Sequence, residues 1–175
     1  MIERMGRRII IRKAEPDDAD GIARVCADGW RDTYRGIYEP ERIESAIADY
    51  YAPERIAGEI TASRGWDGWI VAVDEGTVVG AGGGGMIEPG VREVFVLYLD
   101  PTRRREGIGS RLLDAITEQQ RGHGAYEQWV SVDPDNAKGL PFYLARGFQV
   151  RDHRPAWGTT LEGRVSARLM RRLDD

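Results

Sequence analysis

Short apolar segments bounded by turn residues recur along this chain of 175 residues and predict seven strands. The predicted strands are residues 9–13, 69–73, 77–80, 91–99, 128–132, 148–154 and 165–169. The longest, 91–99, carries a nearly continuous apolar run that ends at an Asp-Pro pair. We therefore expect it at the centre of a sheet.

Apolar residues three and four positions apart predict helices between these strands, as Ile22, Val25, Cys26 and Trp30 show. The predicted helices run from about 16 to 30, from 40 to 50 or 51, briefly from 53, from 108, and from 137 or 138 to 146. Prolines open the first three, where a missing N–H costs nothing. With the helices at 40 and 53 placed between the first two strands, the order β-α-α-β-β-β-α-β-α-β-β predicts an α+β fold, and we expect one domain over 1–175.

The segment Gly80-Ala81-Gly82-Gly83-Gly84-Gly85 satisfies G-x-G-x-x-G after a strand. A dinucleotide-binding fold would need a helix next, so that its N-terminus meets the phosphates. Residues 86–90 carry strand and turn signals instead. We therefore expect the glycines to form a flexible loop between two strands.

The end of the long strand carries the strongest functional signal. The apolar run 94–99 breaks at Asp100-Pro101 and continues as Arg103-Arg104-Arg105-Glu106-Gly107-Ile108-Gly109 into an amphipathic helix. Unpaired N–H groups and the positive end of the helix dipole attract phosphate oxygens, and glycines let the backbone approach closely. With three arginines added, the segment predicts a pyrophosphate-binding turn.

A second signal follows the next strand and begins at Asn136, the only asparagine in the chain. Tyr143 and the pair Gly147-Phe148 follow at fixed offsets. With Arg104 to Gly109 as [QR]-x-x-G-x-[GA] and Asn136 to Phe148 as N-x6-Y-x3-G-F, the chain resembles the GNAT superfamily of acetyl-CoA-dependent N-acetyltransferases. The resemblance implies a mixed, mostly antiparallel central sheet flanked by helices.

The same resemblance implies where acetyl-CoA binds. Backbone groups of the long strand are expected to pair with the pantetheine arm, the turn and helix start to hold the pyrophosphate, and Asn136 to contact either region or to cap a helix. The cofactor-binding residues so implied are Leu97, Tyr98, Leu99, Arg104, Arg105, Glu106, Gly107, Ile108, Gly109, Ser110 and Asn136. Tyr143 is expected to offer its hydroxyl to the departing sulfur, with a core tyrosine as the alternative.

Acetyl transfer to an ammonium requires a base, and Glu93 near the start of the long strand is the first candidate. Strand alternation places it on one face with Phe95, Leu97 and Leu99. The alternatives are an ordinary surface glutamate at a strand end, or Glu88 as the base.

Some family members that acetylate protein N-termini carry the base on the following strand, where this chain has Ser131. Aromatic residues of the first helix region and of the loop between the last two strands are expected to line the acceptor site, or else to pack in the core or on the surface. They are Trp30, Tyr34, Tyr38 and Trp157, with Asp32 or Glu15 as sources of negative charge.

Charge and composition argue against several kinds of partner and site. A net charge of -4 and a pI near 5.4 provide no general attraction for nucleic acid. The single cysteine, Cys26, can form no internal disulfide and is expected in the core. His123 and His153 have no partners at metal-ligand spacing, so no metal is expected. No apolar run reaches the length of a membrane helix, and we expect a cytoplasmic protein without a membrane partner.

Together these features predict an N-acetyltransferase that moves acetyl from acetyl-CoA to a primary amine of a small molecule or peptide, by direct attack in a ternary complex. Cys26 lies outside the signature and has no histidine partner, so no acyl-enzyme is expected. The alternative is a noncatalytic CoA-binding regulatory module. The acceptor amine and the oligomeric state stay open, with a homodimer among the alternatives.

Overall fold

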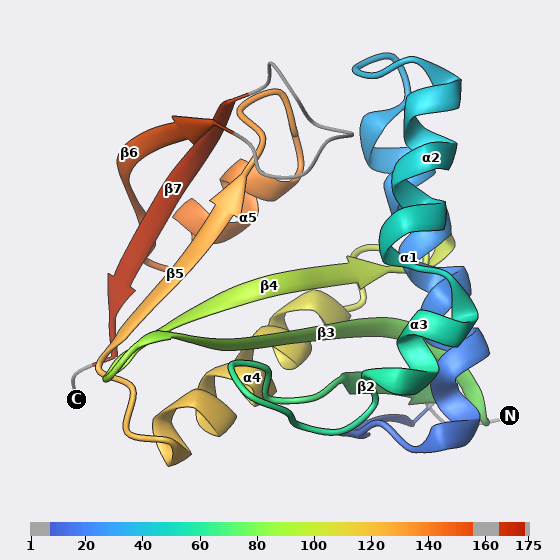
Figure 1. Cartoon of the computed structure of the whole chain (residues 1–175), viewed down its shortest axis with the longest axis horizontal. Coiled ribbons are helices and arrows are strands. Elements are labelled where there is room, and N and C mark those ends of the chain that lie inside the picture. Colours follow the sequence, from blue (N-terminus) through green and yellow to red (C-terminus); the bar gives the residue numbers. More distant parts are fainter. Residues whose placement is uncertain (1–7, 156–164, 174–175) are drawn as a thin grey trace, which may run out of the picture.

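The computed structural model describes residues 8–155 and 165–173 as a seven-stranded sheet with helices on both faces (Figure 1). The strand order is β1-β2-β3-β4-β5-β7-β6, and only β4 and β5 are parallel neighbours. The strands are β1 (Ile9–Lys13), β2 (Ile70–Asp74), β3 (Thr77–Glu88), β4 (Val91–Leu99), β5 (Glu127–Val132), β6 (Gln149–Pro155) and β7 (Val165–Arg172). The helices are α1 (Ala19–Tyr34), α2 (Pro40–Tyr50), α3 (Pro53–Gly58), α4 (Ile108–Gly122) and α5 (Gly139–Leu144).

The predicted order of elements is confirmed, and the two faces of the sheet are covered by different helices. On one face, α1 and α3 bury apolar residues such as Ile22 and Ile56 against Val71. On the other face, α4 buries Leu112 and Ile116 against alternate residues of the same strands. Because successive strand residues point to opposite faces, the central strands are apolar on both sides.

The sheet opens in its middle. β4 pairs with β5 only over the segments 91–94 and 127–130, and the two strands then diverge (Figure 1). The last residues of β4, from 95 to 99, therefore have a backbone edge that β5 does not cover. A strand edge left unpaired in this way can bind an extended ligand through main-chain hydrogen bonds.

The glycine run is not the flexible loop that the sequence predicts, because β3 continues through it to Glu88. These glycines are buried. Their missing side chains make room on both faces of the sheet. A Cβ at Gly82 would stand 2.9 Å from Ile116 of α4, and one at Gly85 would stand 1.8 Å from the carbonyl oxygen of Gly65. Close packing on both sides, rather than flexibility, explains the run.

A bulge in β4 overturns the predicted side-chain alternation. Gly83 pairs with Val96 and Gly84 pairs with Val94, so Phe95 is an extra residue without a partner on β3. One extra residue reverses which face the earlier positions occupy. Glu93 consequently lies on the α1 face, away from the face that carries Leu97 and Leu99.

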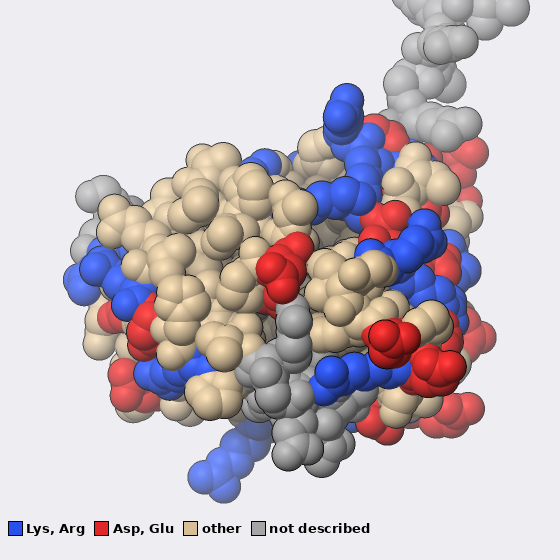
Figure 2. All heavy atoms as spheres, turned by 90° about the horizontal axis from the view of Figure 1, so that it is seen from above, with Lys and Arg blue, Asp and Glu red and all other residues tan. Residues whose placement is uncertain are grey.

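Three further features concern the cysteine, the length of the helices and the distribution of surface charge. Cys26 of α1 is fully buried in the core on the α1 face of the sheet, as expected. In the described part of the chain, no helix combines the length and the hydropathy needed to cross a membrane. Basic and acidic side chains are interspersed on the face drawn in Figure 2.

Candidate active site

A cleft opens where β4 and β5 diverge. It is lined by residues 94–99 of β4 and 130–132 of β5, together with the end of α1 and the starts of α4 and α5. We name it the β4–β5 cleft. Six of the predicted cofactor-binding residues line it, namely Leu97, Tyr98, Leu99, Arg104, Gly109 and Asn136.

The turn before α4 forms one end of this cleft. Gly107 has a φ of 77°, a conformation that glycine adopts without strain, and as the N-cap residue of α4 it has no side chain with which to cap the first turn. The first turn also carries no acidic residue. Its backbone N–H groups and dipole are thus available to an anion, as the sequence predicts.

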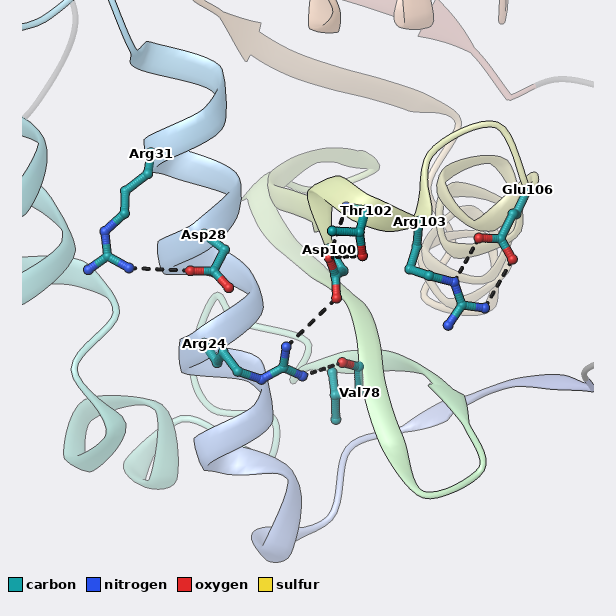
Figure 3. Close-up of polar contacts among 8 residues, drawn as sticks. All are labelled: Arg24, Asp28, Arg31, Val78, Asp100, Thr102, Arg103 and Glu106. Atoms are coloured by element: carbon teal, nitrogen blue, oxygen red, sulfur yellow. Dashed lines mark hydrogen bonds and ion pairs between the residues drawn. The ribbon is translucent and has the colours of Figure 1, made fainter.

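Side-chain contacts hold this turn in place (Figure 3). Asp100 accepts hydrogen bonds from the backbone and hydroxyl of Thr102, and Arg24 of α1 approaches it within 3.8 Å. Arg103 is ion-paired to Asp74 at 2.8 Å and to Glu106 at 2.7 Å. Of the three consecutive arginines, Arg103 therefore fastens the turn instead of facing the cleft.

The other predicted residues of the turn lie around it without lining the cleft. Arg105 is exposed and has a φ of 66°, and Glu106 is bound to Arg103. Ile108 is buried in the core under α4. The hydroxyl of Ser110 accepts hydrogen bonds from Arg146 of the segment after α5.

Of the three consecutive arginines, Arg104 is the one that lines the cleft, together with Lys138, and Asp32 of α1 pairs with both cations. The Arg104 Nη2 and the Lys138 Nζ donate to the same Oδ2 of Asp32, at 2.7 and 2.9 Å. The Nε of Arg104 is buried and has no hydrogen-bond partner among the described residues. A buried guanidinium nitrogen of this kind is suited to a phosphate oxygen, so the site fits the pyrophosphate of CoA.

The second predicted motif borders the same cleft. Asn136 Oδ1 accepts hydrogen bonds from the backbone N–H groups of Lys138 and Gly139, at 3.2 and 2.8 Å, and so caps α5. Tyr143 is buried, with its ring edge-on to those of Phe142 and Phe148. Burial raises the pKa of the Tyr143 phenol, which keeps it protonated and able to donate at neutral pH.

A second cavity, rich in aromatic residues, lies on the α1 face of β4. Its walls share Tyr34, Tyr98, Ser131 and residues 94–96 with the β4–β5 cleft. We name it the aromatic cavity. Its aromatic lining consists of Trp30, Tyr34, Tyr38, Tyr50, Tyr51, Trp66, Trp69, Phe95 and Tyr98.

Glu93 faces this cavity near the place where the two spaces meet. Only 14% of its side-chain surface is exposed, so it is not an ordinary surface glutamate. Its Oε1 accepts a hydrogen bond from Ser131 at 3.2 Å and lies 3.5 Å from Arg168 of β7. Burial raises the pKa of Glu93, and the charges of Arg168 and Arg154, together with the Ser131 bond, oppose that rise.

Two more carboxylates line the aromatic cavity, and the sequence prediction missed both. Asp133 is buried and accepts a hydrogen bond of 2.6 Å from the hydroxyl of Tyr38. Glu59 follows α3. Asp133 lies two residues beyond Ser131, so strand alternation could have placed it on the same face as Ser131 and near Glu93, but the predicted strand ends at 132.

Several other predicted site residues do not line the aromatic cavity. Glu88 is exposed at the end of β3, outside both spaces, whereas Glu93 lines the aromatic cavity. Glu15 forms a capping box with Asp18, and Asp32 lies beside Arg104 instead of in the aromatic cavity. Trp157 lies outside the described residues. No group of three or more metal-ligating side chains occurs in 8–155 or 165–173.

Comparisons with known proteins agree with this geometry. The family model described as Acetyltransferase (GNAT) family matches residues 27–148. A spermidine N(1)-acetyltransferase of Thermoplasma acidophilum is 31% identical over 150 residues, covering 82% of this chain and 90% of that protein. A ribosomal protein bS18-alanine N-acetyltransferase of Escherichia coli is 29% identical over 77 residues, covering 44% of this chain and 52% of that protein.

Solved structures show the same fold. The PaiA N-acetyltransferase of Thermoplasma acidophilum, crystallised in complex with coenzyme A, superposes with a TM-score of 0.81 at 27% identity. The superposition covers 94% of this chain and 99% of that chain. A GCN5-related N-acetyltransferase of Rhodopseudomonas palustris gives a TM-score of 0.77 at 18% identity and covers 97% and 99% of the two chains.

Proposed function

Because this chain belongs to the GNAT acetyltransferase family and uses acetyl-CoA as its cosubstrate, we propose that it acetylates a primary amine of a polyamine directly, in a ternary complex. The family assignment confirms the resemblance seen in the two sequence motifs. One observation carries the proposal: the largely buried carboxylate of Glu93 lines the aromatic cavity and accepts a hydrogen bond from Ser131, a residue that lines both the cavity and the β4–β5 cleft.

The first chemical requirement is to deprotonate the acceptor. An alkyl ammonium with a pKa near 10.4 has no lone pair, and neutralising it at pH 7 costs about 4.6 kcal/mol. Glu93 accepts that proton, and its raised pKa makes it a stronger base than a surface glutamate. The nitrogen lone pair then attacks the thioester carbonyl carbon, forming the C–N bond as the C–S bond breaks. Backbone N–H groups at the uncovered edge of β4 are suited to bind the carbonyl oxygen.

The departing sulfur needs a proton, and Tyr143 is suited to supply it or to hydrogen-bond to it. A thiol pKa near 8.5 and a phenol pKa near 10 make full proton transfer uphill by about 2 kcal/mol in water. Burial raises the pKa of Tyr143 further, which favours a hydrogen bond to the sulfur over complete transfer. The proton released by the nitrogen when the amide forms balances the one that sulfur gains.

The lining of the aromatic cavity supports a polyamine as the acceptor. Ring faces attract ammonium groups, and Glu59, Glu93 and Asp133 add negative charge to the lining. Arg55 pairs with Glu59 at 2.8 Å and Arg168 lies 3.5 Å from Glu93, so these arginines offset part of that charge. The similarity to a protein named for spermidine acetylation points in the same direction. Ser131 occupies the position where some N-terminal acetyltransferases carry a base, which disfavours a protein N-terminus as the acceptor.

A thiol-release assay with acetyl-CoA tests the proposal, using spermidine beside a monoamine and an N-terminal peptide. We expect turnover of spermidine and at least a 100-fold loss of kcat in Glu93→Gln, the low end of about 10²–10⁴ for general-base catalysis. Binding of acetyl-CoA without turnover of any amine would favour the regulatory-module alternative. Unchanged turnover in Glu93→Gln would contradict the assignment of the base.

A further inference from the structure

The backbone of Glu93 is held from the opposite side of the sheet. Gln120 of α4 is fully buried, and its side-chain Nε2 donates a hydrogen bond of 3.0 Å to the carbonyl oxygen of Glu93. α4 covers the face of the sheet opposite the aromatic cavity. This hydrogen bond therefore joins β4, beside the bulge at Phe95, to the helix on that opposite face. The carboxylate and the carbonyl of one residue thus make contacts on opposite faces.

Gly84 makes this contact possible. A Cβ at Gly84 would stand 2.1 Å from the carbonyl oxygen of Glu93 and 2.6 Å from the Nε2 of Gln120. Any larger residue at this position would displace either the carbonyl or the amide that binds it. The glycine is therefore explained by the contact between α4 and β4.

A buried relay fixes which way the Gln120 amide points. Arg171 donates from Nε to Gln128 Oε1 at 2.8 Å, and Gln128 Nε2 donates to Gln120 Oε1 at 2.9 Å. Arginine has no acceptor, so the oxygen of Gln128 must face it. Gln128 therefore presents its nitrogen to Gln120, and Gln120 presents its own nitrogen to Glu93. The direction of every bond in the relay follows from its first donor.

We propose that Gln120 is a positioning residue for the reaction, which fixes the backbone at Glu93 and thereby aims the carboxylate into the aromatic cavity. The inference rests on the proposed role of Glu93 as the base. A general base acts only within hydrogen-bond reach of the proton that it takes, and a displacement of about 1 Å can cost 10²-fold in rate. Bulged backbone has fewer ladder hydrogen bonds to resist such a displacement.

A double-mutant cycle tests this coupling. Gln120→Met keeps the length and burial of the side chain but removes the donor, and Glu93→Gln removes the base. Thr117→Val is the matched control. Thr117 is buried three residues earlier on α4 and accepts bonds from Gln128 and Arg171, but among the described residues no hydrogen bond joins it to Glu93. Kinetics with acetyl-CoA and spermidine are measured beside the thermal stability of each variant.

We expect Gln120→Met to lower kcat by about tenfold with little change in the KM for acetyl-CoA, and to have no further effect once Glu93 is Gln. Additive losses in the double variant, or an equal loss in Thr117→Val at equal stability, would overturn the inference. If Glu93→Gln alone leaves kcat unchanged, the proposed base fails, and the role of Gln120 fails with it.

A titration of the free protein gives a second readout that needs no acceptor. Carbon-13 NMR of labelled glutamate side chains, with Glu93→Gln for assignment, reports the pKa of Glu93. Burial, which raises this pKa, is the largest influence on it, ahead of the opposing contacts with Arg168, Ser131 and Arg154. We expect Gln120→Met to lower the pKa of Glu93 toward the ordinary value as the carboxylate gains solvent, and Thr117→Val to leave it unchanged. No shift in Gln120→Met would contradict the inference, whatever the acceptor is.

Discussion

The indole ring of Trp66 occupies the space that a side chain at Gly83 would need. A Cβ at Gly83 would stand 2.4 Å from Cη2 of that ring. Trp66 is fixed at its other end by a 2.8 Å hydrogen bond from Nε1 to the carbonyl of Glu59. A glycine of β3 therefore determines where one wall of the aromatic cavity lies.

Gly83→Ala should consequently alter the aromatic cavity, which is the proposed acceptor site. The ring must move, and we expect stability to fall by about 1–3 kcal/mol, as is usual when a packed site is overfilled. The KM for the amine should rise more than the KM for acetyl-CoA. Gly122→Ala is the control, because a Cβ there meets nothing within 4 Å. Equal behaviour of the two variants in thermal unfolding and kinetics would refute the prediction.

Asp32→Asn should strengthen acetyl-CoA binding. The Asp32 carboxylate neutralises Arg104 and Lys138, both of which line the β4–β5 cleft and can attract phosphates. Removing a partly exposed charge of this kind is worth about 0.5–1 kcal/mol, or about two- to fivefold in Kd at low salt. Calorimetric titration with CoA measures the change. Asp28→Asn, one turn earlier and paired with Arg31, should leave Kd unchanged.

Arg168→Met should shift the acid limb of the pH–rate profile to higher pH. Arg168 lowers the pKa of Glu93, so without it burial raises that pKa further. The carboxylate is then ionised only at higher pH, and kcat/KM falls below the new pKa while it is retained above it. Arg168→Lys keeps the charge and should shift the profile less. A shift of the acid limb to lower pH in Arg168→Met would contradict this assignment of charges.

Asp133→Asn should discriminate between acceptors. If Asp133 binds a second ammonium of a polyamine, losing that charge-assisted bond costs about 1.5–3 kcal/mol, or about 10–100-fold in KM. A monoamine, which has no second ammonium, should lose much less. Steady-state kinetics with spermidine and a monoamine of similar length make the comparison within one variant. Equal losses for both amines would exclude this role for Asp133.

The elements of the fold could be predicted because each depends on local pattern. The boundaries of β1 and β4 follow from apolar runs and turn residues, and those of α2 and the start of α4 follow from proline, glycine and helical spacing. The glycine run misled the prediction because its cause is not local. The segment around Trp66 and the side chains of α4 pack against β3 from distant parts of the chain.

The candidate site likewise has parts that could be predicted from the sequence and parts that could not. The turn at Arg104 and the cap at Asn136 were predictable because a phosphate-binding helix start and a capped helix are short motifs. The face of Glu93 was not, since one unpaired residue at Phe95 reverses the alternation and no sequence signal marks it. The partners Arg168 and Gln120 come from elements joined only by the folded sheet.

The buried position of Cys26 also bears on how the enzyme can be measured. Its side chain has no exposed surface, and burial raises the pKa of its thiol, so the reactive thiolate is scarce at neutral pH. Since this is the only cysteine in the sequence, a disulfide reagent added to the native protein should react with released coenzyme A alone. The same property leaves the surface free for a single introduced cysteine, to which a spectroscopic label can be attached without a competing site.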